Sequence, residues 1–138
     1  MKKKIIITAS IFGALAVIAG AFGAHSLEGS ISPKNLEIWH TAVQYQFYHV
    51  FALLFLSTLS RFKTRLLGYC YYLFTFGIIF FSGSLYLLAC DDLLDWGIIP
   101  VLVPITPIGG LLFIGAWIIL LTAALRNKLS GGSSEHRA

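Results

Sequence analysis

Long apolar segments alternate with short polar ones along the 138-residue chain. The apolar segments match the roughly 20 residues that a helix needs to cross the hydrocarbon core of a bilayer. Four helices are predicted, over residues 5–24, 41–60, 67–90 and 107–125. The serine- and glycine-rich residues 129–138 are predicted to be a disordered tail. The sequence therefore predicts an all-α, multi-pass fold, in which residues 1–128 form one four-helix transmembrane domain with short loops.

The second predicted helix is unusually polar for a membrane segment. Several of its polar side chains recur at i, i+3, i+4, i+7 and i+8, which places them on one helix face. They are Thr41, Gln44, Tyr45, Tyr48 and His49. Because polar groups are costly against lipid, we predict that this face turns toward the other helices, near Ser82 and Ser84.

Other polar residues fall in the same half of the predicted bundle. His25 ends the first helix, Ser82 and Ser84 lie near the end of the third, and Thr106 precedes the fourth. The candidate polar cluster therefore comprises His25, Gln44, Tyr45, Tyr48, His49, Ser82, Ser84 and Thr106. Such a cluster is either a ligand-binding site or a set of hydrogen bonds between helices.

Small residues form a seam along the first predicted helix. Gly13, Ala16, Gly20 and Gly23 or Ala24 share one face, and small residues let helix backbones approach closely. Gly109 and Gly110 offer the same close approach on the fourth helix. These faces are the predicted contact surfaces within the bundle, or with a second copy or another membrane protein.

Capping residues and prolines set the expected helix boundaries. Ser32 and Pro33 are typical of an N-cap followed by the first helical position. Residues 33–39 are expected to form one or two interfacial turns, with Trp39 as an anchor at the lipid headgroups. Pro100 and Pro104 disfavour a regular helix over residues 97–106, which we expect to be interfacial or re-entrant, so that Thr106-Pro107 begins the last helix.

Composition and charge support a membrane location. Hydrophobic residues make up 57% of the chain and charged residues only 12%, against a usual charged share of about a quarter. Nine of the 10 lysines and arginines lie before the first helix, between the second and third, or after the fourth. Since cations stay on the cytoplasmic side, both termini are predicted to be cytoplasmic. The first apolar segment exceeds a usual signal-peptide core of about 7–15 residues, so we expect it to be retained.

The sequence contains no recognisable catalytic or metal-binding set. Cys70 and Cys90 are separated by about 30 Å on one helix and cannot form a disulfide. The membrane segments contain no carboxylate, and neither zinc-ligand spacing nor a nucleophile motif occurs. His40 and His49 lie on opposite sides of a helix, so a haem site would need His25 with one of them. We predict no enzyme activity, no cofactor and no metal, and the absence of a basic aromatic helix argues against nucleic acid.

Four motifs, in order, carry a resemblance to a known family. They are Ala21-Phe22-Gly23-Ala24-His25, Thr41-Ala42-Val43-Gln44-Tyr45-Gln46-Phe47-Tyr48-His49, Ser82-Gly83-Ser84-Leu85-Tyr86 and Thr106-Pro107-Ile108-Gly109-Gly110. The chain resembles uncharacterised protein family 0382, also called domain of unknown function 423, which is similar to transmembrane protein 256. The resemblance implies a small multi-pass protein of the bacterial plasma membrane and brings no activity or catalytic residue.

Two roles follow for a lipid-embedded bundle of this kind. The first expectation is a structural or interaction subunit, whose polar cluster fixes its own helices or those of a partner. The alternative is a binding or transport module for a small or lipophilic ligand that enters from the outer leaflet. A wet pocket in the outer half favours the second role, and a dry, mutually bonded cluster favours the first.

Overall fold

The computed structural model describes residues 1–59, 65–94, 97 and 99–126, which are helical apart from short connections and include no strand. The all-α prediction is confirmed. Two π-helical segments, η1 and η2, continue α-helices without a break. The elements are α1 (Lys2–Phe22), η1 (Gly23–Leu27), α2 (Pro33–Thr58), α3 (Leu66–Gly77), η2 (Ile78–Ser82), α4 (Gly83–Ala89), α5 (Asp91–Leu94) and α6 (Ile99–Arg126). The predicted tail lies outside the described residues.

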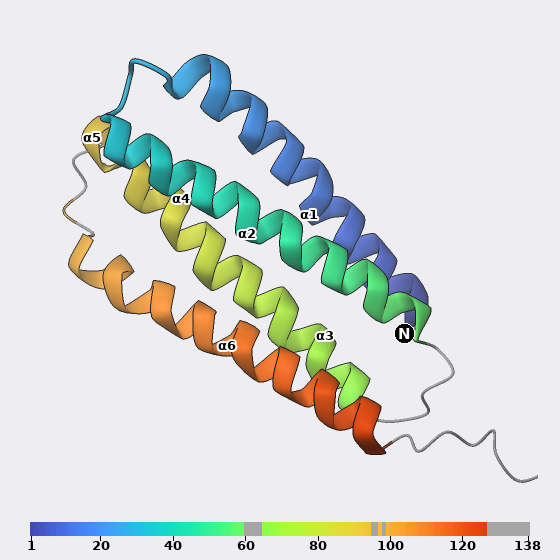
Figure 1. Ribbon diagram of the computed structural model, residues 1–138. Coiled ribbons are helices and arrows are strands. Elements are labelled where there is room, and N and C mark those ends of the chain that lie inside the picture. The colour runs from blue at the N-terminus through green and yellow to red at the C-terminus, as the bar shows by residue number, and fades with distance from the viewer. Residues whose placement is uncertain (60–64, 95–96, 98, 127–138) are drawn as a thin grey trace, which may run out of the picture.

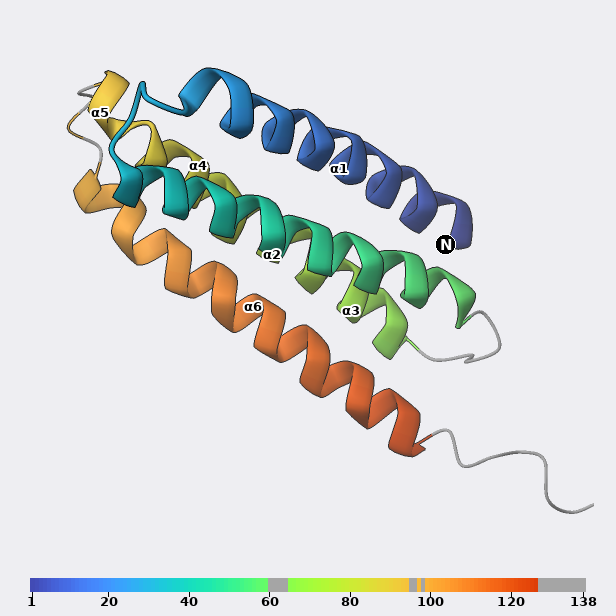
Figure 2. The ribbon, with the colours of Figure 1, turned by 45° about the horizontal axis from the view of Figure 1, so that its top comes forward.

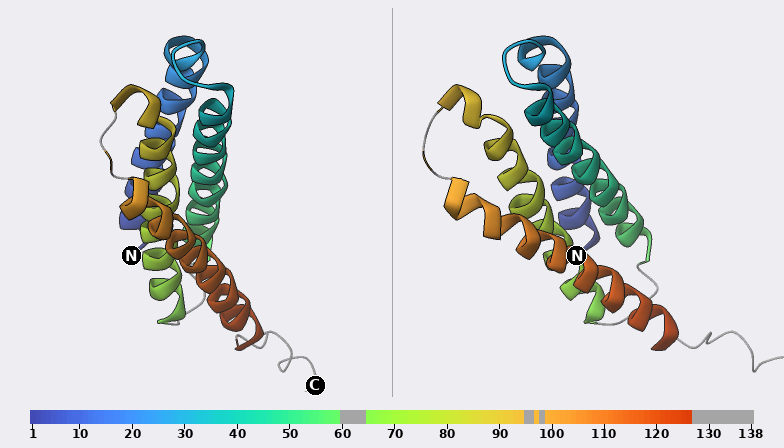
Figure 3. Two further views of the ribbon diagram at one scale, coloured as in Figure 1. Left: turned by 90° about the vertical axis from the view of Figure 1, so that its left-hand side faces the viewer. Right: turned by 60° about the vertical axis from the view of Figure 1, so that its left-hand side comes forward.

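The long helical segments form an antiparallel bundle (Figure 1). The start of α1, the end of α2, the start of α3 and the end of α6 lie at one end of the molecule. The short helix α5 lies at the other end, near the start of α2. Turning the molecule shows that α6 is inclined to the other helices (Figure 3).

Three helical segments are long and apolar enough to cross a membrane. They are Lys2–Leu27, Leu66–Ala89 and Ile99–Arg126. Among the described helices α2 is long as well, but it does not belong to this group. Its glutamines, tyrosines and histidines lower its hydropathy, which is the property that separates it from the other three.

The small-residue seam of α1 packs against α2, as its spacing indicates. A Cβ added to Gly13 would lie 3.5 Å from Val50, and one added to Gly20 would lie 3.6 Å from Val43. At Gly23 the added atom would lie 2.7 Å from the indole of Trp39. The seam is therefore covered within this chain, and the absence of side chains there brings the two helices together.

Glycines also permit the close packing of α6 against α3 and η2. A Cβ on Gly109 would lie 2.7 Å from the Cα of Phe81, which is backbone and cannot swing aside. Beside it, a Cβ on Gly77 would lie 2.6 Å from the ring of Phe113. The predicted close approach at Gly109 is confirmed. This contact fixes the position of α6 along its own axis relative to η2.

Helix α2 begins earlier than the membrane segment predicted from residue 41. Ser32 is the N-cap and its hydroxyl accepts a hydrogen bond from the backbone N–H of Asn35, with Pro33 in the first turn, which confirms the predicted cap. The expected interfacial turns are simply the first turns of α2. Trp39 is buried among the helices, so its prediction as a headgroup anchor is wrong.

The predicted non-helical stretch before residue 107 is also wrong, because α6 begins at Ile99 and contains both Pro104 and Pro107. Pro100 lies in the first turn, where its missing N–H has no partner to lose. Pro104 and Pro107 do remove donors, but membrane helices tolerate this loss when neighbouring helices re-satisfy the backbone. Packing at Gly109 and Phe113 holds the segment helical, so Thr106 lies within α6 and does not cap it.

Candidate functional site

A groove runs along the side of the bundle between α1 and the α3–η2–α4 segment. At the start of α1 the two approach each other, since the Thr8 and Tyr71 hydroxyls are hydrogen-bonded at 2.9 Å and Lys4 donates to Tyr72 at 3.3 Å. Farther along, α1 packs against α2 and stands away from α4 (Figure 2). A groove of about 430 Å³ occupies this space. It is lined by Phe12, Leu15, Ile18, Ala19, Phe22, Trp39, Gln46, Ile78, Ile79, Gly83 and Tyr86.

The groove has a buried floor and exposed walls. Gln46, Trp39 and Ile78 on the floor are almost fully buried. Ile18 on α1 and Ile79 on η2, by contrast, are 64% and 44% exposed. The groove therefore opens sideways to the surroundings of the bundle, and its mouth is apolar.

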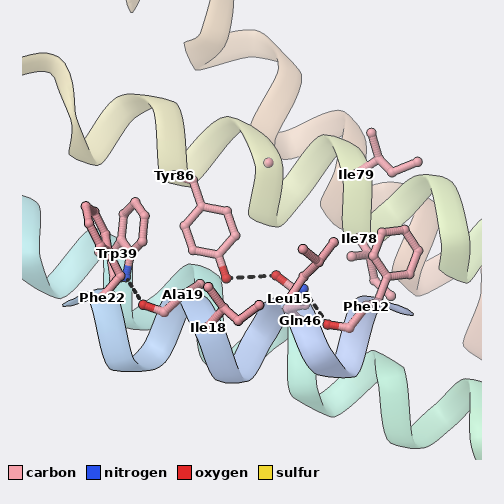
Figure 4. Close-up of a pocket in the computed structure, with 11 residues that line it drawn as sticks. Phe12, Leu15, Ile18, Ala19, Phe22, Trp39, Gln46, Ile78, Ile79 and Tyr86 are labelled. Atoms are coloured by element: carbon pink, nitrogen blue, oxygen red, sulfur yellow. Dashed lines mark hydrogen bonds between the residues drawn. The ribbon is translucent and has the colours of Figure 1, made fainter. Parts of the chain in front are cut away.

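A chain of hydrogen bonds crosses the floor (Figure 4). The Tyr86 hydroxyl donates to Gln46 Oε1 at 2.7 Å, and Gln46 Nε2 donates to the carbonyl oxygen of Phe12 at 2.7 Å. A helix carbonyl keeps a second lone pair for such a bond. One carboxamide thereby connects α4, α2 and α1, and a buried amide that would be costly if unpaired is satisfied.

Trp39 closes the end of the groove near η1. Its indole N–H donates to the carbonyl oxygen of Ala19 at 2.8 Å. Its ring centroid lies 4.6 Å from that of Tyr86 and 5.8 Å from that of Phe22. Packing of these two rings on the hydrogen-bonded indole closes this end of the groove.

His49 lies in a separate aromatic environment. Its ring is parallel to that of Phe113, with centroids 3.4 Å apart and 3° between the planes. Its Nδ1 is 2.8 Å from the carbonyl oxygen of Tyr45, one turn earlier in α2. The ring is buried as predicted, but it packs between α2 and α6 and does not line the groove.

Ser84 and Thr106 are the candidate residues that the fold brings into direct contact. Their hydroxyl oxygens lie 2.7 Å apart and join α4 to α6. Ser82, only 1% exposed, has a hydroxyl without a hydrogen-bond partner among the described residues. These serines are buried in the bundle, as the polar pattern predicts, but within the described part of the chain His49 forms no hydrogen bond with either of them.

The remaining candidates lie on the surface of the protein. His25 is exposed in η1, and Gln44, Tyr45 and Tyr48 are exposed along α2. The prediction that this face turns into the bundle is therefore wrong for Gln44 and Tyr48, whereas the ring of Tyr45 packs on Phe81 of η2 with centroids 4.6 Å apart. The inward face repeats three and four residues apart through Trp39, Ala42, Gln46, His49, Leu53 and Leu56, which is the spacing of a helix packed along its length.

The groove's polar residues were not among the candidates predicted from sequence. Gln46 lies within the motif of the second helix, but on the opposite side from Gln44. The available signal was its spacing of seven residues from Trp39 and from Leu53, which marks one helix face. Tyr86 and Trp39 carried no distinguishing signal, because aromatic rings are common near membrane interfaces.

The lining of the groove has the composition of a binding site. Its lining includes no acidic, basic, histidine or cysteine side chain among the described residues. The polar groups on its floor are a neutral amide, a phenol and an indole. Such a mostly apolar site with a few fixed polar atoms is typical of sites for small or lipophilic molecules.

Membrane-length apolar helices around a laterally open groove define a small helical membrane protein. The family model described as "Protein of unknown function (DUF423)" matches residues 19–110. The chain belongs to this family, whose curated members carry the name UPF0382, and the family resemblance is thereby confirmed.

The relatives are membrane proteins of several bacteria. A UPF0382 membrane protein of Staphylococcus epidermidis is 43% identical over 124 residues, covering 90% of this chain and 97% of the relative. The corresponding protein YwdK of Bacillus subtilis is 42% identical, with 90% and 98% covered. The inner membrane protein YgdD of Escherichia coli is 34% identical, with 94% and 95% covered. No solved structure matches the chain.

Proposed function

We propose that this protein binds a neutral lipophilic molecule in the groove between α1 and the α3–η2–α4 segment. The observation that carries the proposal is a groove of about 430 Å³ with an apolar mouth and a hydrogen-bonded floor. Ligand sites commonly have volumes of about 300–1,000 Å³ and this mixture of apolar walls with few polar groups. Because the mouth opens sideways, the ligand would enter from the lipid.

The floor also restricts the chemistry of the ligand. Gln46 uses one of its two amide hydrogens on Phe12, and the Tyr86 oxygen keeps lone pairs after donating to Gln46. A ligand at this depth would meet neutral donors and acceptors only. A charged headgroup would lack a counter-ion in the groove and would cost several kcal/mol to bury. A hydrocarbon chain carrying a neutral group such as a carbonyl fits best.

The test is the lipid content of the purified protein. Gly83 lines the groove and a Cβ added there meets no atom within 4 Å, so Gly83→Leu should direct a bulky side chain into the groove. The matched control is Ala14→Leu, on the exposed side of α1 outside the groove. Mass spectrometry of extracted lipids should find a molecule enriched over the membrane average in wild type and in Ala14→Leu, and depleted in Gly83→Leu. Equal content in all three proteins would contradict the proposal.

We also propose that α2 crosses the membrane and that both termini are cytoplasmic, in the bacterial plasma membrane. The support for the crossing is that α2 runs the length of the other three segments. The support for the orientation is the distribution of lysines and arginines. Reporter fusions at Glu28 and Lys63 should give opposite signals, and matching signals would contradict the proposed topology.

A non-catalytic interaction subunit is the second candidate function. It is favoured by the interior outside the groove, where Ser84 and Thr106 bond to each other and His49 bonds within its own helix. Such contacts fix helices in place and need no ligand. Loss of a partner protein on purification, with lipid content identical to the membrane average, would favour this role over ligand binding.

A further inference from the structure

Two polar side chains of α2, those of Gln44 and Tyr48, face away from the rest of the protein. Tyr48 is 57% exposed and Gln44 is exposed as well, whereas the partly exposed ring of Tyr45 packs on that of Phe81 with centroids 4.6 Å apart. Neither the carboxamide of Gln44 nor the hydroxyls of the two tyrosines form a hydrogen bond with the described residues. Gln44 and Tyr48 are four residues apart and lie on one face, followed by the exposed rings of Phe51 and Phe55.

The depth of Gln44 makes this exposure costly. Gln46 bonds to the carbonyl of Phe12, which lies about 15 Å along α1 from Lys2, near the middle of that membrane-length segment. Gln44 is displaced from Gln46 by only about 3 Å along α2. On the proposed crossing of α2 it lies inside the hydrocarbon region. An amide without a partner is unfavourable there, whereas in a soluble helix it would simply bond to water.

We propose that α2 is the interface of a homodimer, in which Gln44 pairs with Gln44 of the partner subunit. Copies of one chain share their orientation in the membrane, so a two-fold axis along the membrane normal puts each residue at the depth of its own copy. A carboxamide both donates and accepts, and two facing carboxamides therefore satisfy each other. The seam through Gln44, Tyr48, Phe51 and Phe55, with alternating four- and three-residue steps, is the spacing of packed helix pairs.

The small-residue faces of α1 and α6 are already occupied within the described bundle. The small-residue seam of α1 is covered by α2, and Gly109 on α6 is covered by η2. The exposed side chains of α6, such as Ile114 and Ile118, are apolar and are suited to lipid. If the protein acts as an interaction subunit, this interface identifies a second copy of the chain as its partner. The dimer does not depend on a ligand in the groove.

Disulfide trapping in membranes tests the interface. With Phe51→Cys on the seam, copper-catalysed oxidation should trap a covalent dimer. Ile114→Cys on the exposed side of α6 is the matched control and should stay monomeric, as should the wild type with its native Cys70 and Cys90. A dimer from Ile114→Cys equal to that from Phe51→Cys would overturn the proposal, as would the absence of a dimer from Phe51→Cys.

The role of the carboxamide is tested by dimer affinity in liposomes, measured by resonance energy transfer between labelled copies. Gln44→Leu should weaken dimerisation about tenfold, which corresponds to about 1.4 kcal/mol. Gln44→Asn, which keeps the amide, should recover part of this loss. Unchanged affinity in Gln44→Leu would overturn the proposal. Lipid content measured on the same samples separates the two ideas, because Gln44→Leu should leave the groove ligand in place.

Discussion

Gln46 is the residue on which the arrangement of the groove depends most directly. Its carboxamide bonds at once to Tyr86 and to the backbone of α1. Without it, α1 and α4 would face each other across apolar side chains only, with no polar contact to set their separation. The groove therefore has a defined width because one side chain spans its floor.

Removal of the Tyr86 hydroxyl should have a measurable but modest effect. Tyr86→Phe breaks the bond to Gln46, and an interhelical hydrogen bond of this kind contributes about 0.6 kcal/mol on average and at most about 1.7 kcal/mol. Thermal unfolding in detergent should show a small decrease in stability, while Tyr69→Phe, at an exposed tyrosine of α3, should show none. A similar decrease in both variants would mean that the bond contributes nothing specific.

His49→Phe should leave a folded and inserted protein. The imidazole bonds only within its own helix and stacks on Phe113, so a phenyl ring keeps the stacking and loses a local bond of about 1 kcal/mol. We expect a slightly lower thermal stability and an unchanged lipid content. Loss of the bound lipid in His49→Phe would place the ligand near α6 instead of in the groove.

At the residue scale, the sequence predicted which helix was polar but not which side of it faced inward. One glutamine lies on each side of α2 and apolar residues occur on both sides, so that amphipathicity does not distinguish Gln44 from Gln46. The structure does so through Trp39, which packs over Gly23 of η1, donates to Ala19 of α1 and thereby rotates Gln46 inward. The burial of Ser82, Ser84 and His49 was predictable from their positions in the sequence. That Ser84 pairs with Thr106 while His49 packs on Phe113 was not.

Among the elements, the contact between α6 and η2 depends on a single glycine. Gly109→Ala would place a methyl group 2.7 Å from the Cα of Phe81, and overpacking of this kind costs about 1–3 kcal/mol. Gly83→Ala meets no atom within 4 Å and should gain up to about 1 kcal/mol of helix propensity. Thermal unfolding of the two variants should therefore change in opposite directions. Destabilisation by both would show that helix flexibility, and not close packing, explains the glycines.

A second element-scale contact joins α5 to the start of α2, outside the membrane-spanning segments. The backbone N–H of Ser32 donates to Asp92 Oδ2 at 2.9 Å. This bond, with a further one from the Ser32 side chain, lowers the pKa of the Asp92 carboxyl. Because the folded pKa lies below the unfolded value of about 3.9, the carboxylate contributes stability above that value and loses it as pH falls through the folded pKa.

The pH dependence of unfolding checks this contact. Between about pH 5 and pH 2 the wild type should lose stability more steeply than Asp92→Asn, which cannot titrate. Asp91→Asn is the control, since it removes a neighbouring carboxylate but keeps the bond between Ser32 and Asp92, and it should retain the loss of stability that this bond produces. Identical profiles for wild type and Asp92→Asn would show that the contact has no energetic role in solution.

Helix ends were predictable where the chain chemistry is local. Ser32 and Pro33 gave the start of α2 because a cap and its proline act within a single turn. The start of α6 was not predictable from Pro100, Pro104 and Pro107, because tertiary packing at Gly109 outweighs the donors that the prolines remove. The existence of the helices could thus be predicted from the length of the apolar segments. The residues at which they begin and end depend also on tertiary contacts.

At the scale of the whole molecule, the groove exists because α1 packs along its length against α2 alone. Its small residues bring it against α2, and its contacts with α3 are confined to the end near Thr8. A lipid-facing space is then left beside η2 and α4. Hydropathy predicts the number of apolar segments. The space between two helices depends on the sizes of the side chains on both, and the sequence of one helix alone does not show it.

The central claim is that this groove holds a selected lipophilic molecule, and site-specific photocrosslinking in the native membrane tests it most directly. A photoreactive phenylalanine analogue replaces Ile79 in the groove, or Ile114 on the exposed side of α6 as a control. After irradiation, the intact mass of the Ile79 protein should show adducts of one molecular class, and these should disappear when Gly83→Leu is added. The Ile114 protein should carry only the mixture of surrounding bulk lipids. If both positions yield the same mixture, in the proportions of the membrane, the groove is filled by bulk lipid and the account is wrong.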